Sequence, residues 1–291
     1  MMARDEHPRD RPDRTRLAPE LASAAAELAA AGVSSPRVDA EWLAAHVLDV
    51  PRGRLVLVDT IRAEEAGRFR ELVAGRAKRV PLQHLVGTAA FRHLELAVGD
   101  GVFVPRPETE LLAGWGIERT VPGATVVDLC SGSGAIALSV ADESPAGRVI
   151  AVERSPEALP WLRRNATGHD TVEVLEADVT DPDLLAELRG QVDVLLCNPP
   201  YVPVGTPVPP EVSDHDPADA VFGGADGLSV IRPVIALAAA LLKPGGWVGI
   251  EHDDVHGAAV PALLRADGRF TEVTAHDDLT GRPRYATARR Q

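Results

Sequence analysis

The sequence predicts an α/β protein in which a mostly parallel β-sheet with an antiparallel edge follows a small N-terminal helical domain. From residue 120 onward, short apolar runs alternate with amphipathic stretches, which is typical of parallel strands joined by crossover helices. Before residue 80, the apolar residues recur at helical spacing instead. A chain of 291 residues is long enough for one large domain or two smaller ones.

The chain divides into four predicted segments. Residues 1–16 mix Arg with Asp and Glu and offer nothing to bury, so we expect a disordered tail. Residues 17–79 are predicted to form the helical domain, with helices at Leu21–Ala31, Val38–Leu48 and Ala63–Ala77. In residues 80–106, glycines interrupt short apolar runs, which predicts a β-hairpin connector. Residues 107–291 are predicted to form the α/β domain.

The α/β domain is predicted from five apolar runs and the helical stretches between them. The predicted parallel strands are Thr125–Leu129, Val149–Val152, Val172–Leu175, Val192–Cys197 and Trp247–Ile250. The predicted helices are Ala135–Ala141, Pro156–Asn165, Pro182–Leu188 and Ser229–Leu242. The last two runs, Phe270–Ala275 and Tyr285–Ala288, have no crossover helix between them, so we expect an antiparallel pair at one edge.

The composition restricts the function classes. A net charge of −13 disfavours direct nucleic-acid binding, because an acidic surface releases no counterions from a phosphate backbone. The two cysteines are too few for a disulfide framework or a zinc site. The apolar run Val234–Leu242 is much shorter than the about 20 residues that span a membrane. Because the first 16 residues also lack an apolar leader, we expect a cytoplasmic protein that does not enter a membrane.

Three successive strand ends carry residues suited to an adenosine-like ligand. After Asp128 and Leu129, the glycine-containing turn Cys130-Ser131-Gly132-Ser133-Gly134 lets a ligand approach the backbone at a helix N-terminus. Glu153 ends the second strand, where an acid can accept from both ribose hydroxyls. Asp178 and Val179 follow the third strand and suit an adenine amino group and ring. Each feature also has a simpler explanation when it is taken alone. The glycine turn is a common way to end a strand, Glu153 could be a solvated loop acid, and Asp178 could be a helix cap.

The fourth strand ends in the tetrad Asn198-Pro199-Pro200-Tyr201. Neither proline has an N–H, so this segment offers acceptors in a stiff, extended geometry. The Asn198 side-chain oxygen and the Pro199 carbonyl could both accept from one planar –NH₂ group, and Tyr201 could stack on its plane. The alternatives are a simple turn or a polyproline ligand.

These motifs together resemble the class I S-adenosylmethionine-dependent methyltransferases, which have a Rossmann-like sheet. More narrowly, the chain resembles the HemK/PrmC-type methyltransferases, which modify the glutamine amide in the Gly-Gly-Gln motif of class I peptide chain release factors. The resemblance also covers four further runs: Val38-Asp39-Ala40-Glu41, Pro81-Leu82-Gln83-His84, Val104-Pro105-Arg106-Pro107-Glu108-Thr109-Glu110 and Phe222-Gly223-Gly224-Ala225-Asp226-Gly227-Leu228.

The resemblance implies S-adenosylmethionine as cofactor and release factors as protein partners. From the residues themselves, we expect no metal site. It implies that the turn from Cys130 holds the methionine part, with Asp128 counted among the cofactor residues. Glu153 would hold the ribose, and Asp178 with Val179 the adenine. The resemblance further implies that the tetrad binds the substrate amide beside the cofactor: Asn198, Pro199, Pro200 and Tyr201. Asn198, Pro199 and Tyr201 are the expected catalytic residues, and Asn198 is also counted among the cofactor residues. From the connector, Phe103 and Arg106 would lie near the cofactor. The alternative is that Phe103 only packs in the hairpin and that Arg106 is a surface charge.

The chain departs from the family pattern at a few positions. Cys130 stands where Gly is common, Glu153 where Asp is common, and Val179 where an aromatic residue sometimes lies. After Glu251, the family pattern leads us to expect Gly and Gln at the positions of Asp253 and His256. The sequence alone does not predict what the differences at Asp253 and His256 change. His252 and His256 are four residues apart but do not form a zinc-protease motif.

Other functions remain open at this point. The same tetrad would serve a methyltransferase acting on a ribosomal-protein glutamine or on an exocyclic amino group of DNA or RNA. The spacing Gly132-x-Gly134-x-x-Ala137 also fits a nicotinamide-dependent dehydrogenase, which would leave the tetrad unexplained. A non-catalytic adenosine-binding module is the last alternative.

Overall fold

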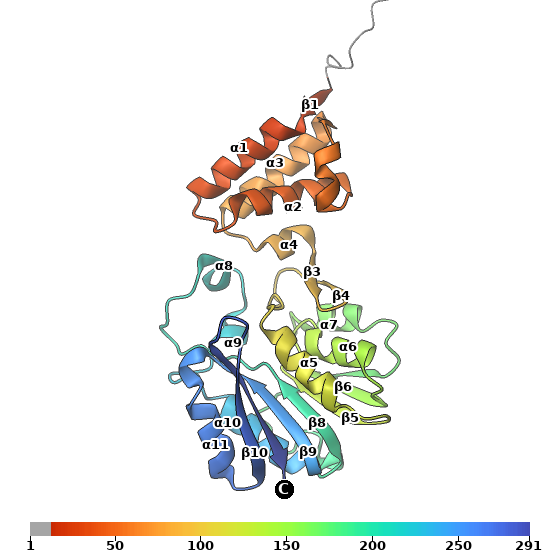
Figure 1. The fold of residues 1–291 in the computed structure, drawn as a ribbon, viewed down its shortest axis with the longest axis vertical. Helices are drawn as coiled ribbons and strands as arrows, with labels where there is room; N and C mark the ends of the chain where they lie inside the picture. Colours follow the sequence, from red (N-terminus) through yellow and green to blue (C-terminus); the bar gives the residue numbers. More distant parts are fainter. Residues whose placement is uncertain (1–12) are drawn as a thin grey trace, which may run out of the picture. The chain divides into compact units, whose positions relative to one another are not determined.

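Residues 13–291 are described by the computed structural model, and they divide into two units that meet at Val86 and Gly87 along the chain (Figure 1). The expected disorder of residues 1–12 lies outside the described residues. For residues 14–16, the expectation of a disordered tail is wrong. They form strand β1 (Arg14–Arg16), which pairs antiparallel with β2 (Thr60–Arg62). The Arg14 guanidinium adds hydrogen bonds to the side chain and carbonyl of Thr60.

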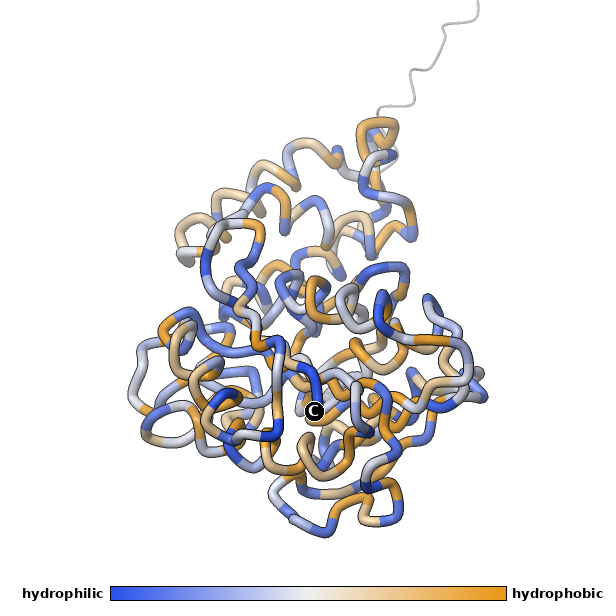
Figure 2. Tube along the Cα trace, turned by 60° about the horizontal axis from the view of Figure 1, so that its bottom comes forward, coloured by the Kyte–Doolittle hydropathy of each residue, from blue (hydrophilic) through white to orange (hydrophobic). Residues whose placement is uncertain are grey.

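The first unit is helical. Its three longer helices are α1 (Leu17–Ala30), α2 (Pro36–Leu48) and α3 (Ala63–Ala77), close to the predicted bounds. Their buried faces meet around Leu28, Leu43 and Phe69, each no more than 1% exposed. Figure 2 shows hydrophobic and hydrophilic residues alternating along these helices, as expected for helices with one buried face. Two short helices complete the unit: η1 (Arg52–Leu57) and α4 (Leu82–Val86).

The predicted connector is only partly a hairpin. Its first residues form α4 and belong to the helical unit, which corrects the expectation of a hairpin from residue 80. The hairpin itself consists of β3 (Thr88–Phe91) and β4 (Leu94–Ala97), which pair antiparallel. At the hairpin turn, Arg92 has φ +51° and its side chain is held by Glu143.

The second unit is built on a seven-stranded sheet of order β10-β11-β9-β8-β5-β6-β7. The first five strands in the chain run parallel, and β11 is antiparallel to both of its neighbours, which confirms the predicted fold class. The strands are β5 (Thr125–Leu129), β6 (Arg148–Glu153), β7 (Val172–Glu176), β8 (Val192–Cys197), β9 (Leu242–Glu251), β10 (Phe270–Asp277) and β11 (Pro283–Arg290).

The strand order reverses direction at β5. From β5 the chain adds β6 and β7 on one side and then returns to add β8 and β9 on the other. In such sheets, ligands bind at the carboxyl ends of the two strands flanking the reversal. Here the last residues of these strands are direct neighbours, since Leu129 pairs with Cys197. The glycine turn and the tetrad therefore leave the sheet side by side.

Helices cover both faces of the sheet (Figure 1). Alternate strand residues, such as Val126 and Val127, enter separate apolar clusters on opposite faces. One cluster contains α5 (Thr109–Arg119), α6 (Ala135–Glu143) and α7 (Leu159–Asn165); the other contains α10 (Ile231–Leu241) and α11 (Ala259–Asp267). The shorter helices are η2 (Ala186–Leu188), α8 (Pro210–Ser213), α9 (Ala218–Val221) and η3 (Asp254–His256).

The predicted helix Pro182–Leu188 is wrong as an α-helix. Only the single 3₁₀ turn η2 forms there, because Leu185 adopts a left-handed conformation, φ +53°, that ends any regular helix. The sequence analysis also missed α5 and α11. Among the described residues, no helix has the length and apolar character needed to cross a lipid bilayer.

Close packing of α5 on the sheet depends on glycine. A Cβ atom added at Gly116 would lie 2.5 Å from Cδ1 of Leu196, a fully buried residue of β8. We expect Gly116→Ala to lower the free energy of unfolding by about 1–3 kcal/mol, the usual effect of overpacking. Calorimetric melting measures this. Gly67→Ala in α3 is the control, because its added Cβ meets no described atom within 4 Å beyond its chain neighbours and the backbone of its own helix. Equal destabilisation by both substitutions would contradict the packing argument.

Candidate active site

A cavity of about 760 Å³ lies at the carboxyl ends of the parallel strands in the second unit. Its lining includes residues at the ends of β5, β6, β7 and β8, the four strand ends where the sequence predicted site residues. The predicted site residues that line it are Phe103, Arg106, Cys130, Ser131, Gly132, Ser133, Glu153, Asp178, Val179, Asn198, Pro199, Pro200 and Tyr201. Of the predicted site residues, Asp128 and Gly134 are not part of this lining.

The turn after β5 has an unusual backbone. Cys130, Gly132 and Gly134 all have positive φ, at +59°, +54° and +91°. Glycine adopts this region freely, whereas a cysteine there is strained. Apart from Gly132 and its two chain neighbours, no described residue has an atom within 4 Å of a Cβ added at Gly132, so its backbone is open to a ligand.

Asp128 lies behind the turn. It is 1% exposed, and its Oδ2 accepts from the backbone N–H of Ala137 in α6 (3.1 Å). Burial raises the pKa of this carboxyl to about 7. Asp128 thus connects the end of β5 to α6 and stabilises the turn between them from its buried side.

Glu153 holds the turn from the neighbouring strand. One of its oxygens accepts from the backbone N–H of Gly132 (2.8 Å), and the other from those of Arg154 and Ser155 (2.8 Å each). A carboxylate has about four lone-pair sites, so about one acceptor site remains for a hydroxyl of a ribose. The side chain is buried at the cavity wall.

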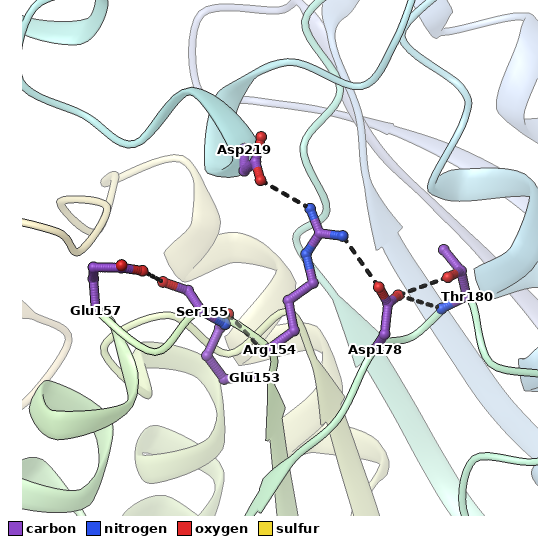
Figure 3. A network of polar contacts seen from close by, with 7 residues as sticks. All are labelled: Glu153, Arg154, Ser155, Glu157, Asp178, Thr180 and Asp219. Carbon is purple, nitrogen blue, oxygen red and sulfur yellow. Dashed lines mark hydrogen bonds and ion pairs between the residues drawn. The ribbon is translucent and has the colours of Figure 1, made fainter.

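Arg154, which the sequence analysis did not single out, crosses between two acidic side chains at the cavity (Figure 3). Its guanidinium lies 3.1 Å from Asp178 and 3.4 Å from Asp219 of α9. The other oxygen of Asp178 accepts from the backbone N–H and the hydroxyl of Thr180. These hydrogen bonds, with Arg154, lower the pKa of Asp178. Asp178 therefore caps its own loop as well as facing the cavity.

Phe103 and Arg106 also have defined partners. The Arg106 guanidinium lies 4.6 Å above the Phe103 ring and pairs at 2.5 Å with the buried carboxylate of Asp216. Arg106 is therefore not a free surface charge. It links the segment after the hairpin to the loop that follows the tetrad.

The tetrad is held from behind by two side chains. The Asn198 Nδ2 group donates to the Thr109 hydroxyl at the start of α5 (3.1 Å), which leaves the Asn198 Oδ1 as an acceptor for the cavity. The Tyr201 hydroxyl donates to Oε1 of Glu251 at the end of β9 (3.0 Å). Burial and Glu251 raise the pKa of Tyr201 above its ordinary value. Sequence reasoning assigned no role to Thr109 or Glu251, although an acid ending a strand was the signal that had selected Glu153.

The structure accounts for the unexplained residues after Glu251. Asp253 accepts from the backbone N–H of Val255 and so caps the short helix η3. The His256 Nε2–H group donates to the carbonyl oxygen of Asp226 (2.9 Å). A Cβ added at the neighbouring Gly227 would lie 2.3 Å from the carbonyl oxygen of Tyr201, so this loop packs against the tetrad. In the part of the chain that the structure describes, no group of three His, Cys, Asp or Glu residues could hold a metal ion.

The cavity suits S-adenosylmethionine. It combines an open left-handed turn, an acid with one acceptor site left and an apolar wall at Val179. Together with the reversed β11 strand, this site defines an S-adenosylmethionine-dependent methyltransferase of Rossmann-like fold. The family model "Methyltransferase small domain" matches residues 109–206, and "PrmC N-terminal domain" matches residues 21–87.

Known proteins narrow the class further. The chain is 58% identical over 277 residues to the release factor glutamine methyltransferase of Mycolicibacterium smegmatis, covering 95% of this chain and 98% of that one. It is 48% identical to the Streptomyces coelicolor protein of the same name, over 94% and 98% of the two chains. The chain therefore belongs to the release factor glutamine methyltransferase family. A T. thermophilus 16S rRNA methyltransferase with AdoMet and guanosine shares the fold, with TM-score 0.51 and 24% identity, over 70% of this chain and 50% of that one.

The arrangement around Glu153 predicts its effect on cofactor binding. Glu153→Gln replaces one acceptor oxygen by an –NH₂ group that faces a backbone N–H. We expect affinity for S-adenosylmethionine to fall by about tenfold or more, since hydrogen bonds to charged groups contribute about 1.5–3 kcal/mol. Isothermal titration calorimetry measures this. Glu176→Gln is the matched control, because Glu176 pairs in register with Glu153 but is not part of the cavity lining. Unchanged affinity in Glu153→Gln would contradict the assignment.

Proposed function

We propose that this protein transfers the methyl group of S-adenosylmethionine to the side-chain amide nitrogen of the glutamine in the Gly-Gly-Gln motif of class I peptide chain release factors. The observation that carries the proposal is the tetrad at the end of β8, which lines the same cavity as the glycine turn. The names of the relatives support the same substrate.

The tetrad explains how a flat amide is held. An amide nitrogen is a weak nucleophile because its lone pair is delocalised into the carbonyl. The Asn198 Oδ1 and the Pro199 carbonyl accept its two N–H groups, so that the nitrogen faces the methyl donor. Positioning of this kind contributes up to about 7–11 kcal/mol to lowering a barrier. When bound, S-adenosylmethionine supplies an activated methyl group on its sulfonium.

The same two acceptors also stabilise the charge that develops in the transition state. Positive charge grows on the nitrogen as the new N–C bond forms, and oxygen acceptors aimed at its protons stabilise that charge. Neither proline offers a competing N–H donor. The proton leaves after methyl transfer, so the mechanism assigns no general base.

The remaining segments fit a protein substrate. We propose that the helical domain, residues 17–79, grips the release factor and that residues 107–291 carry out the transfer, joined by the connector. A folded protein needs more contact surface than the cavity offers. The net charge of −13 opposes a nucleic-acid substrate. We place the reaction in the cytoplasm, where release factors work.

The clamp predicts that Asn198→Ala abolishes methylation but leaves cofactor binding intact. We expect the turnover of a purified release factor to fall by at least about 10²-fold, since the variant loses an acceptor that acts in the transition state. Transfer of labelled methyl groups measures turnover, and calorimetry measures cofactor affinity. Near-normal turnover in this variant would rule out the clamp.

The substrate is tested with a panel. The wild-type protein and labelled S-adenosylmethionine are incubated separately with release factors, ribosomal proteins, DNA and RNA. A release factor whose Gly-Gly-Gln glutamine is replaced by alanine is the control and should stay unlabelled. Label on a ribosomal protein alone or on nucleic acid alone would overturn the substrate assignment.

A further inference from the structure

The side chain of Arg154 has no part in the proposed reaction, yet it lines the cavity. It reaches from the end of β6 to a point between two carboxylates that belong to other segments (Figure 3). One guanidinium nitrogen lies 3.1 Å from Asp178, which follows β7, and another lies 3.4 Å from Asp219 of α9. Arg154 therefore bridges two parts of the cavity wall that are far apart in the chain.

This bridge lies at the mouth of the cavity. All three side chains line the cavity and are also open to solvent, with exposed fractions of 47% for Arg154, 42% for Asp178 and 91% for Asp219. The turn after β5 lies deeper, since Ser131 and Ser133 are only 7% and 3% exposed. A cofactor with its adenine at Asp178 and its methionine part at that turn therefore has its adenine end nearest to the mouth.

The first end of the bridge is held in place. Asp178 Oδ1 accepts from the backbone N–H and the hydroxyl of Thr180 (2.8 and 2.7 Å), whereas Oδ2 faces Arg154. The backbone of Arg154 is fixed as well, because its N–H donates to Glu153 (2.8 Å). Neither the Asp178 carboxylate nor the base of the arginine can move without breaking these hydrogen bonds.

The second end of the bridge is also anchored, on both sides of α9. Three residues before Asp219, the fully buried carboxylate of Asp216 pairs with Arg106 (2.5 Å). Directly after α9, Phe222 forms a β-bridge with Val202, and the Val202 N–H donates to the carbonyl oxygen at the end of the helix. Asp219 therefore projects from a fixed support.

The moving part is the guanidinium. Exposed side chains change rotamer within picoseconds to nanoseconds. An exposed ion pair forms only a few times more often than it breaks, because solvent and side-chain entropy oppose it. When a ligand must pass such a fast-moving group, the rate of passage is proportional to the fraction of time that the path is open. Two weak pairs at the mouth can therefore set the rate of exchange without adding much to stability.

We propose that Arg154 gates cofactor exchange: its guanidinium, paired with Asp178 and Asp219, bars the mouth of the cavity, and the nucleoside passes when these pairs open. The proposal concerns S-adenosylmethionine and its product, so it does not depend on the identity of the methyl acceptor. Both pairs form within the protein, so the bar slows entry and exit alike. It therefore affects the rates of exchange much more than the dissociation constant.

Asp219→Ala tests the gate, because it removes one fixed end and leaves Arg154 and Asp178 in place. We expect the association and dissociation rates of S-adenosylhomocysteine to rise together by about twofold to fivefold, the range that an exposed ion pair accounts for. The dissociation constant should stay within about twofold. Surface plasmon resonance on the full-length protein measures both rates. S-adenosylhomocysteine carries no net charge at neutral pH, so the lost charge alters its long-range attraction little.

The matched control is Asp183→Ala. Asp183 forms an equally exposed pair with Arg189 (2.8 Å), and neither residue lines the cavity. This variant should exchange S-adenosylhomocysteine at wild-type rates. Equal acceleration in Asp183→Ala and Asp219→Ala would show a general effect of surface charge and would overturn the proposal.

A second variant changes the bar itself. Arg154→Lys keeps the charge but replaces a fork of two nitrogens, each facing one carboxylate, by a single ammonium. It should also speed exchange in both directions. High salt should speed exchange more in the wild type than in Asp219→Ala, because salt weakens exposed ion pairs.

The two rates together decide the outcome. If dissociation becomes faster while association stays unchanged, the bridge contacts the ligand instead of barring its path, and the proposal is wrong. Wild-type rates in both Asp219→Ala and Arg154→Lys would also refute it. Should Asp219→Ala melt at a lower temperature, Arg154→Lys decides alone. No methyl acceptor is present in these measurements, so a failure of the proposed function would be seen separately, as absence of methylation.

Discussion

The direct pairing of β5 with β8 is the constraint on which the site depends. Because Leu129 and Cys197 are neighbours in register, the glycine turn and the tetrad leave adjacent strands at the same edge of the sheet. In the proposed reaction, this adjacency would place a methyl donor at the glycine turn next to an amino group at the tetrad. The strand order, which returns to β5 after β7, produces this adjacency.

Hydrogen bonds and ion pairs hold the loops around the ends of β5 and β8 in place. Glu153 accepts hydrogen bonds from three backbone N–H groups, which fix the turn at Gly132 against the end of β6. Two ion pairs, from Arg106 to Asp216 and from Arg154 to Asp219, connect the cofactor side of the cavity to the loop after the tetrad. Exposed pairs of this kind add little to stability, whereas the pair with the fully buried Asp216 side chain contributes to the position of the loop.

The acidic residues at the strand ends have different tasks according to their burial. Asp178 is half exposed and ionised readily, so it suits a polar contact with a ligand. Asp128 and Glu251 are fully buried, and burial raises the pKa of each to about 7. Their contacts are with the protein itself, beneath the turn and beneath the tetrad. Acidic residues thus face the cavity in one place and support its walls in another.

The sequence by itself determined the class of fold and the chemistry at each strand end. Apolar runs define buried parallel strands, and glycines or prolines limit the backbone locally, so these features need no distant partner. Only the tertiary structure decided which side chains meet behind the site. Thr109 and Asn198 are 89 residues apart, Tyr201 and Glu251 are 50 apart, and Arg106 and Asp216 are 110 apart. Such contacts follow from the order in which strands assemble and from how α5 packs on them, which no local pattern encodes. For the same reason, the strand at Arg14–Arg16 was missed, since it forms only against β2.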